Sequence, residues 1–127
     1  MLQAAKLLIE AVSQLPPGGF EREPQSVQAM VLDNARTVPL RSAAPPPAIT
    51  CDMLKAFTRP TLVMRGEKTQ AIYALIAEAI GKCVPGARHV VLQNLNHVGP
   101  QRDPEVFAGA FLAFLSKNAA GRDAATR

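Results

Sequence analysis

The sequence predicts an α/β fold built on two parallel strands. Two short apolar runs rich in β-branched residues, at about 60–65 and 88–93, are separated by a stretch with helical periodicity. A connection through one helix implies parallel strands and a right-handed crossover, with helices packed on both faces of the sheet. Hydrophobic residues make up 48% of the 127 residues, which allows one compact domain and argues against global disorder.

The strand–helix–strand unit is the most regular part of the sequence. The first strand, PTLVMR, ends at Gly66, and the second, RHVVLQ, follows a turn at Pro85-Gly86. Residues 70–82 between them are predicted to form a helix. Its apolar residues recur at i, i+3, i+4, i+7 and i+8, namely Ile72, Leu75, Ile76, Ala79 and Ile80.

The part before this unit is predicted to be helical and then irregular. An amphipathic helix over 2–15 stops at Pro16-Pro17-Gly18-Gly19, and a second helix covers about 25–36. Residues 37–49 contain four prolines and read as a linker or an extended surface segment. Thr50 can cap a short helix, CDMLKAF, because its hydroxyl can accept from a free backbone N–H.

The last helix has a strong start signal. Asp103 is a cap residue, Pro104 suits the first helical position and Glu105 lies in the first turn. The apolar face that follows consists of Phe107, Ala110, Phe111, Phe114 and Leu115. Residues 118–127 have no such face, and we expect a disordered tail.

A parallel sheet of two strands is incomplete. It has two open edges and cannot cover its own helices, and the apolar strand over 60–65 calls for neighbours on both sides. We therefore expect either further chain or a partner to supply the missing strands.

Composition excludes several classes of protein. The net charge is +4, but lysine and arginine are scattered, so a nucleic-acid or anionic-surface binder would rest on net charge alone. No segment approaches the roughly 20 apolar residues of a membrane span. Cys51 and Cys83 lack metal-type spacing, and with no export signal we expect both to be reduced in a soluble cytoplasmic protein.

The order of motifs resembles one enzyme family. PTLVMRGE at 60–67 is followed by a helix, then VPGA at 84–87, a strand, a loop with His97, and DPEVF at 103–107 opening the last helix. This arrangement resembles the C-terminal portion of α/β-hydrolases over residues 50–117. The resemblance implies the last two core strands, the histidine loop and the terminal helix of that fold, a partial α/β-hydrolase fold. Residues 1–40 then resemble the helical cap of that family, and 41–49 form a proline-rich linker.

The resemblance implies a role for His97 as the general base. An imidazole titrates near neutrality, so it can take the proton of a nucleophile and return it to the leaving group. His89 matches no catalytic position and reads as structural or exposed. Thr69 lies where the family commonly has its catalytic aspartate, which leaves Glu67 as the nearest candidate acid, unless the acid follows an earlier strand. Asn96 stands where the family usually has a small residue.

The family's nucleophile elbow and oxyanion hole have no counterpart here. No serine or cysteine is flanked by glycines between a strand and a helix; the serines are Ser13, Ser26, Ser42 and Ser116. We expect a C-terminal fragment of a hydrolase acting on an ester or similar small apolar substrate, inactive alone and needing no cofactor or metal. The alternative is a non-catalytic module that forms a homodimer or complements another hydrolase segment.

Overall fold

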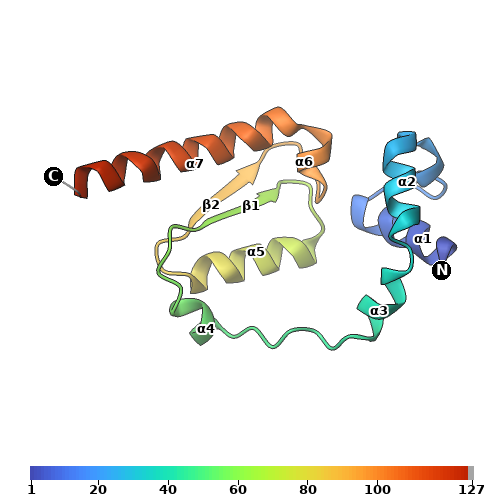
Figure 1. Ribbon diagram of the computed structural model, residues 1–127, viewed down its shortest axis with the longest axis horizontal. Coiled ribbons are helices and arrows are strands. Elements are labelled where there is room, and N and C mark those ends of the chain that lie inside the picture. Colours follow the sequence, from blue (N-terminus) through green and yellow to red (C-terminus); the bar gives the residue numbers. More distant parts are fainter. Residues whose placement is uncertain (126–127) are drawn as a thin grey trace. The chain divides into compact units, whose positions relative to one another are not determined.

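The computed structural model describes residues 1–125 and, within the last helix, side chains as far as Asn118. It contains two compact units, residues 1–48 and residues from 49 onward, which are described separately. The elements labelled in Figure 1 are α1 (Leu2–Ser13), the 3-10 helix η1 (Phe20–Arg22), α2 (Gln25–Asp33), α3 (Thr37–Ala43), α4 (Cys51–Lys55), β1 (Leu62–Gly66), α5 (Ala71–Cys83), β2 (Arg88–Leu92), α6 (Gly99–Arg102) and α7 (Pro104–Ala125).

The first unit is a small helical body built around Phe20. This ring is 1% exposed, and Ala5 of α1 and Ala35 after α2 are also buried. Lys6 reaches across the unit, where its Nζ lies 5.3 Å from the centre of the Phe20 ring and 2.9 Å from a carboxylate oxygen of Glu21. Phe20 is thus the largest fully buried side chain of this unit.

The predicted proline-rich linker begins later than expected. Residues 37–43 form α3 although this helix contains Pro39. The proline lies in the first turn, where a backbone N–H has no partner within the helix, so its missing donor costs little there. The irregular segment is therefore confined to residues 44–50.

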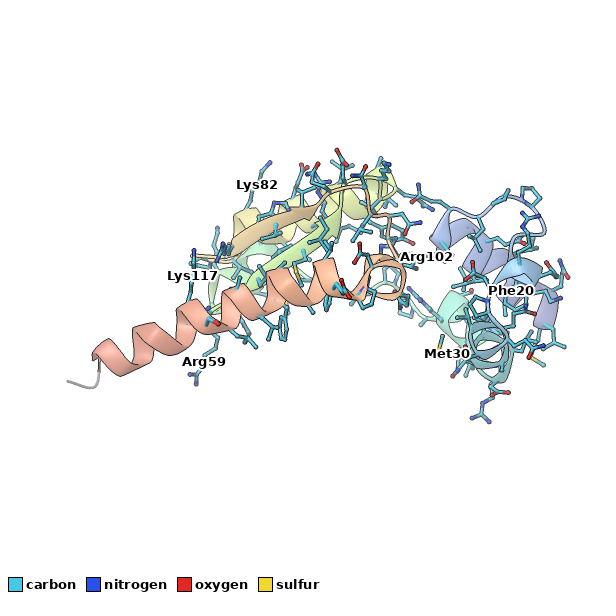
Figure 2. All side chains as sticks on the ribbon, turned by 90° about the horizontal axis from the view of Figure 1, so that it is seen from above. Phe20, Met30, Arg59, Lys82, Arg102 and Lys117 are labelled. Carbon is cyan, nitrogen blue, oxygen red and sulfur yellow. A yellow bond between two sulfur atoms is a disulfide. The ribbon has the colours of Figure 1, made fainter. Side chains whose placement is uncertain are left out.

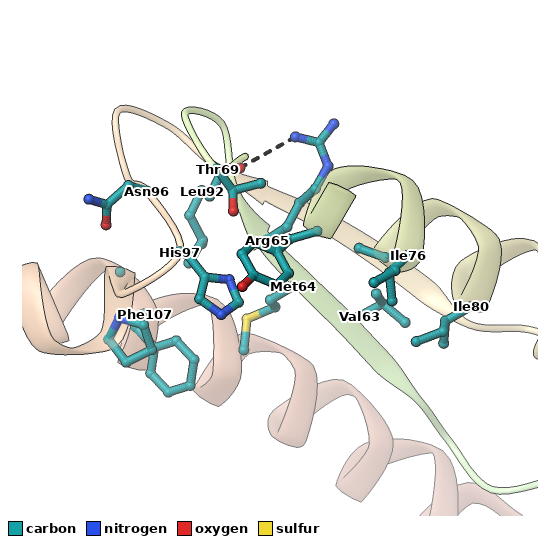
Figure 3. A pocket seen from close by; sticks show the side chains of 15 residues that line it. Val63, Met64, Arg65, Thr69, Ile76, Ile80, Leu92, Asn96, His97 and Phe107 are labelled. Atoms are coloured by element: carbon teal, nitrogen blue, oxygen red, sulfur yellow. Dashed lines mark hydrogen bonds between the residues drawn. The ribbon is translucent and has the colours of Figure 1, made fainter. Parts of the chain in front are cut away.

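The second unit confirms the predicted α/β class with two parallel strands. β1 and β2 pair in parallel from Leu62 opposite Arg88 to Gly66 opposite Leu92. The helices α5 and α7 lie on opposite sides of this sheet (Figure 1). Alternation along β1 matches this arrangement, since Arg65 reaches Glu78 of α5 while the neighbouring Met64 lies on the other face (Figure 3).

Both predicted helix caps are confirmed. The hydroxyl of Thr50 accepts from the backbone N–H of Met53 at 3.3 Å, and Asp103 Oδ1 accepts from the backbone N–H of Val106 at 3.0 Å. The backbone of α7 continues as helix to Ala125, through most of the stretch predicted to be a disordered tail. Alanine, which is frequent in 119–125, has the highest helix propensity. The side chains of the tail lie outside the described residues.

The expectation of two reduced cysteines is wrong. Cys51, the first residue of α4, and Cys83, the last residue of α5, form a disulfide with Cα atoms 5.1 Å apart. Sequence spacing could not reveal this pair, because the 32-residue separation is closed only by the fold of the second unit.

Surface features of the described chain bear on possible partners. None of the helices within residues 1–125 combines the length and the apolarity that a membrane span requires. The basic side chains of the second unit extend from different segments; Arg59, Lys82 and Lys117 point outward from a loop, α5 and α7 respectively (Figure 2).

Candidate functional site

The histidine singled out by the sequence lies beside an apolar pocket. His97 sits in the loop between β2 and α6, and its ring stacks on Tyr73 of α5 with centroids 3.8 Å apart and an interplanar angle of 18°. The pocket has a volume of about 290 Å³ (Figure 3). It is lined by Val63, Met64, Arg65, Gly66, Thr69, Tyr73, Ile76, Ala77, Ile80, Leu92, Asn96, His97, Gly99, Pro100 and Phe107.

The position of this pocket follows from the parallel sheet. It runs along β1 on the side away from β2, between α5 and the start of α7 (Figure 3). The loops after β1 and β2 meet at its end because the carboxyl ends of parallel strands share one edge of a sheet. These two loops bring Thr69 and His97, which are distant in sequence, into the lining of one pocket.

The loop that carries His97 is held against the end of β1. The backbone N–H of Glu67 donates to the carbonyl of Leu92 at 2.9 Å, and that of Lys68 donates to the carbonyl of Leu95 at 2.8 Å. Gly66 is buried at this contact, and a Cβ there would collide with the carbonyl groups of Leu95 and Asn96. Glycine is therefore required for close approach at this position.

Asn96 shapes the turn immediately around His97. Its Oδ1 accepts from the backbone N–H of Val98 at 3.1 Å, which closes a local side-chain turn over the histidine. The left-handed residue in this loop is Asn94, with φ 61°, and not Asn96. An asparagine suits that conformation better than most residues. The asparagine at 96 thus supplies a hydrogen bond that a glycine could not.

Glu67, the candidate acid, is engaged elsewhere. Its Oε2 accepts from the backbone N–H of Asn94 at 2.9 Å, and Glu67 is not among the residues that line the pocket. Within the described residues, no carboxylate forms a hydrogen bond with either ring nitrogen of His97. The carboxylate of Glu67 therefore links the loop after β1 to the loop after β2.

Thr69 and Arg65 present buried polar atoms in this region. The Thr69 hydroxyl and the Arg65 Nε are both buried without a hydrogen-bond partner in the described part of the chain. Arg65 is otherwise satisfied, with Nη1 donating to the carbonyl of Gly66 at 3.4 Å and Nη2 lying 3.5 Å from Glu78. Thr69 thus leaves an unused donor and acceptor beside the histidine loop.

No serine or cysteine lines the pocket in the part of the chain that the structure describes. Ser13 is buried in α1, in the first unit, and Ser116 donates to the carbonyl of Leu112 within α7. Both cysteines form the disulfide and so present no free thiol. His89 is exposed at the start of β2 and lies outside the pocket lining.

The residue missed by sequence reasoning is Tyr73. It is the only tyrosine in the chain, and it lies at intermediate exposure on the face of α5 turned toward the histidine. Its spacing of three residues from Ile76 and seven from Ile80, which line the same pocket, was the available signal. Over residues 1–125, no group of three or more His, Cys, Asp or Glu side chains that could hold a metal ion occurs.

No protein-family model and no curated protein matches the chain.

Proposed function

We propose that this chain supplies the general-base histidine of an α/β-fold hydrolase whose nucleophile is carried by another polypeptide segment. The observation that carries the proposal is the location of His97 on Tyr73, beside an apolar pocket at the carboxyl edge of the two strands. Active sites of open parallel sheets gather at that edge. The motif order from PTLVMRGE to DPEVF supports the same reading.

The chemistry that His97 would perform is proton transfer. Its ring would take the proton of an incoming serine hydroxyl as that group attacks a carbonyl carbon, and then return the proton to the leaving group. Stacking on Tyr73 restricts rotation of the imidazole, which fixes the orientation of its ring plane and so the direction in which its nitrogens exchange protons. The apolar lining favours an ester or another small apolar substrate.

The carboxylate that orients such a base would also come from the other segment. Glu67 is held by the backbone of Asn94, and Thr69 has no charge with which to stabilise an imidazolium. With no serine, cysteine or carboxylate at the pocket, the isolated chain is expected to be inactive.

The test uses the chain as it occurs in its source cells. The tagged chain is recovered under native conditions and divided into two samples. One is labelled with a fluorophosphonate, and the other, untreated, is assayed with p-nitrophenyl butyrate. We expect a labelled partner segment and turnover that His97→Ala lowers by about 10⁴-fold or more. His89→Ala is the matched control, since this exposed histidine lies outside the pocket, and should leave turnover unchanged.

Three results would overturn the proposal. They are full turnover by His97→Ala, turnover by the purified chain alone, and a recovered complex without any fluorophosphonate-reactive group.

A second candidate function is a non-catalytic association module. The open edge of β1 and the exposed apolar side of α5 favour it, because Ile72, Leu75 and Ile76 are 55%, 62% and 48% exposed. Such a module would bind through its sheet edge whether or not His97 takes part in catalysis.

A further inference from the structure

One edge of β1 presents unpaired backbone groups. The backbone N–H of Arg88 donates to the carbonyl of Thr61, and that of Glu67 donates to the carbonyl of Leu92, each at 2.9 Å. In a parallel pair, alternate residues direct both backbone groups to the same neighbour. Residues 61, 63, 65 and 67 therefore face β2, and the N–H and C=O groups of Leu62 and Met64 face away from it.

The flanks of this edge are apolar. Val63 lines the pocket along the edge together with Ile76 and Ile80 of α5 (Figure 3). Ile72 and Leu75 continue the exposed apolar side of the same helix. The one charged side chain of β1, Arg65, lies beside Glu78, so the edge carries no unpaired charge of the kind that protects edge strands.

Apolar surface that a second copy would cover lies beside this edge. Ile72, Leu75 and Ile76 of α5 are 55%, 62% and 48% exposed.

We propose that a second copy of this chain pairs antiparallel with the free edge of β1, about a two-fold axis that passes between the two Val63 residues. In this register Leu62 lies opposite Met64 of the second copy, and the two such pairs form four backbone hydrogen bonds. A register shifted toward Gly66 is disfavoured, because the Gly66 carbonyl already accepts from the backbone N–H of Thr69 and from Arg65.

In this dimer, helices would cover both faces of the combined four-stranded sheet. Four strands at about 4.8 Å spacing span roughly 19 Å, which matches two helices side by side at about 10 Å each. The two copies of α5 would lie together on one face, and the two copies of α7 on the other. Arg65 lies opposite Thr61 of the second copy, so like charges do not meet.

This inference rests on the second candidate function and is an alternative to the proposed catalytic role of His97, because the second copy would lie along the β1 edge that borders the pocket. The experiment measures the mass of the chain and of register variants by analytical ultracentrifugation between 1 and 100 µM. A dimer with a roughly micromolar dissociation constant would form within this range. We expect a discrete dimer of twice 13.6 kDa. Met64→Pro removes an N–H on the free edge, leaves the donors that face β2 in place and should weaken dimerisation by about 30-fold or more. Met64→Leu also changes the side chain but keeps the N–H, and should dimerise normally.

Cysteine substitution tests the axis directly. Val63→Cys places two thiols at a non-hydrogen-bonded pair with Cα atoms about 4.5 Å apart, and should cross-link through residue 63, as mapped by mass spectrometry. Leu62→Cys is the control, since its two copies would be about 8 Å apart, too far for a disulfide.

The outcomes separate the two levels of the proposal. A dimer that Met64→Pro leaves intact and Val63→Cys does not cross-link overturns this register. A chain that remains monomeric at 100 µM overturns the proposal that a second copy binds the β1 edge. If that monomer binds a strand-forming peptide at the β1 edge, the association function still holds. If it binds no such peptide, the association function is overturned as well.

Discussion

Gly66→Ala tests how the histidine loop is held. The Cβ of alanine would meet the carbonyl oxygens of Leu95 and Asn96, which belong to backbone and cannot swing aside as a long side chain would. Overpacking of this kind costs about 1–3 kcal/mol. Displacing the loop would also weaken the two backbone hydrogen bonds from Glu67 and Lys68, each worth about 0.5–1.5 kcal/mol. We expect a total loss of about 2–4 kcal/mol in the free energy of unfolding of the second unit.

The assay exploits the single tyrosine. The chain has no tryptophan, so the fluorescence of Tyr73 reports urea unfolding of the second unit alone. Nuclear Overhauser effects between the Tyr73 and His97 rings report whether the loop keeps its place. Gly109→Ala is the matched control: nothing lies near its Cβ, so alanine in this helix should stabilise by about 1 kcal/mol. Equal stability of Gly66→Ala and the parent chain, with the ring contact intact, would refute the close approach.

Three further predictions concern single interactions. Replacing Cys51 by alanine, or reducing its bond to Cys83, opens a loop with a sequence separation of 32 residues and should lower the free energy of unfolding by about 3–4 kcal/mol. Urea unfolding measures this loss, and an unchanged midpoint would contradict the prediction. Glu67→Ala should cost about 0.5–1.5 kcal/mol of stability and Glu67→Gln less than half as much, because glutamine keeps an acceptor; equal losses would argue against the backbone hydrogen bond. The hydrogen bond from Lys6 holds the pKa of Glu21 below its usual 4.5, so the ionised Glu21 stabilises the fold above pH 4.5, and this stabilisation is lost as the pH falls through the lowered pKa. In Lys6→Met, the free energy of unfolding should therefore fall less steeply between pH 6 and about pH 3. The same slope in Lys6→Met and the parent chain would contradict this prediction.

The regular elements were predictable because local signals and tertiary contacts agree there. The apolar runs at 60–65 and 88–93 correspond to β1 and β2 within two residues at each end. Asp103 and Thr50 act as caps where a side-chain oxygen precedes a helix.

Other elements depended on partners that sequence patterns do not reveal. The disulfide between Cys51 and Cys83 requires two helix ends to meet in space. The helix α3 forms because Pro39 falls in its first turn, which depends on where the helix begins. Phe20 organises the first unit from a 3-10 turn that has no hydrophobic periodicity.

The sequence was enough to predict the histidine of the candidate site, but not the residues that contact it. His97 follows a strand in a recognisable order of motifs, but its stacking on Tyr73 arises from packing between α5 and the loop after β2. Glu67 is adjacent to Gly66 in sequence, and only the register of the two strands shows that its carboxylate turns toward Asn94.

The central claim is that the backbone N–H and C=O groups of Leu62 and Met64 in β1 pair with a strand of a second copy. Amide hydrogen exchange at Met64 and Arg65 tests it directly. The Arg65 amide faces β2 and should exchange slowly at every protein concentration, whereas the Met64 amide should exchange fast in dilute solution and slow down as the concentration rises. A Met64 amide as protected as Arg65 in the most dilute sample, or one that stays unprotected at all concentrations, would contradict the claim.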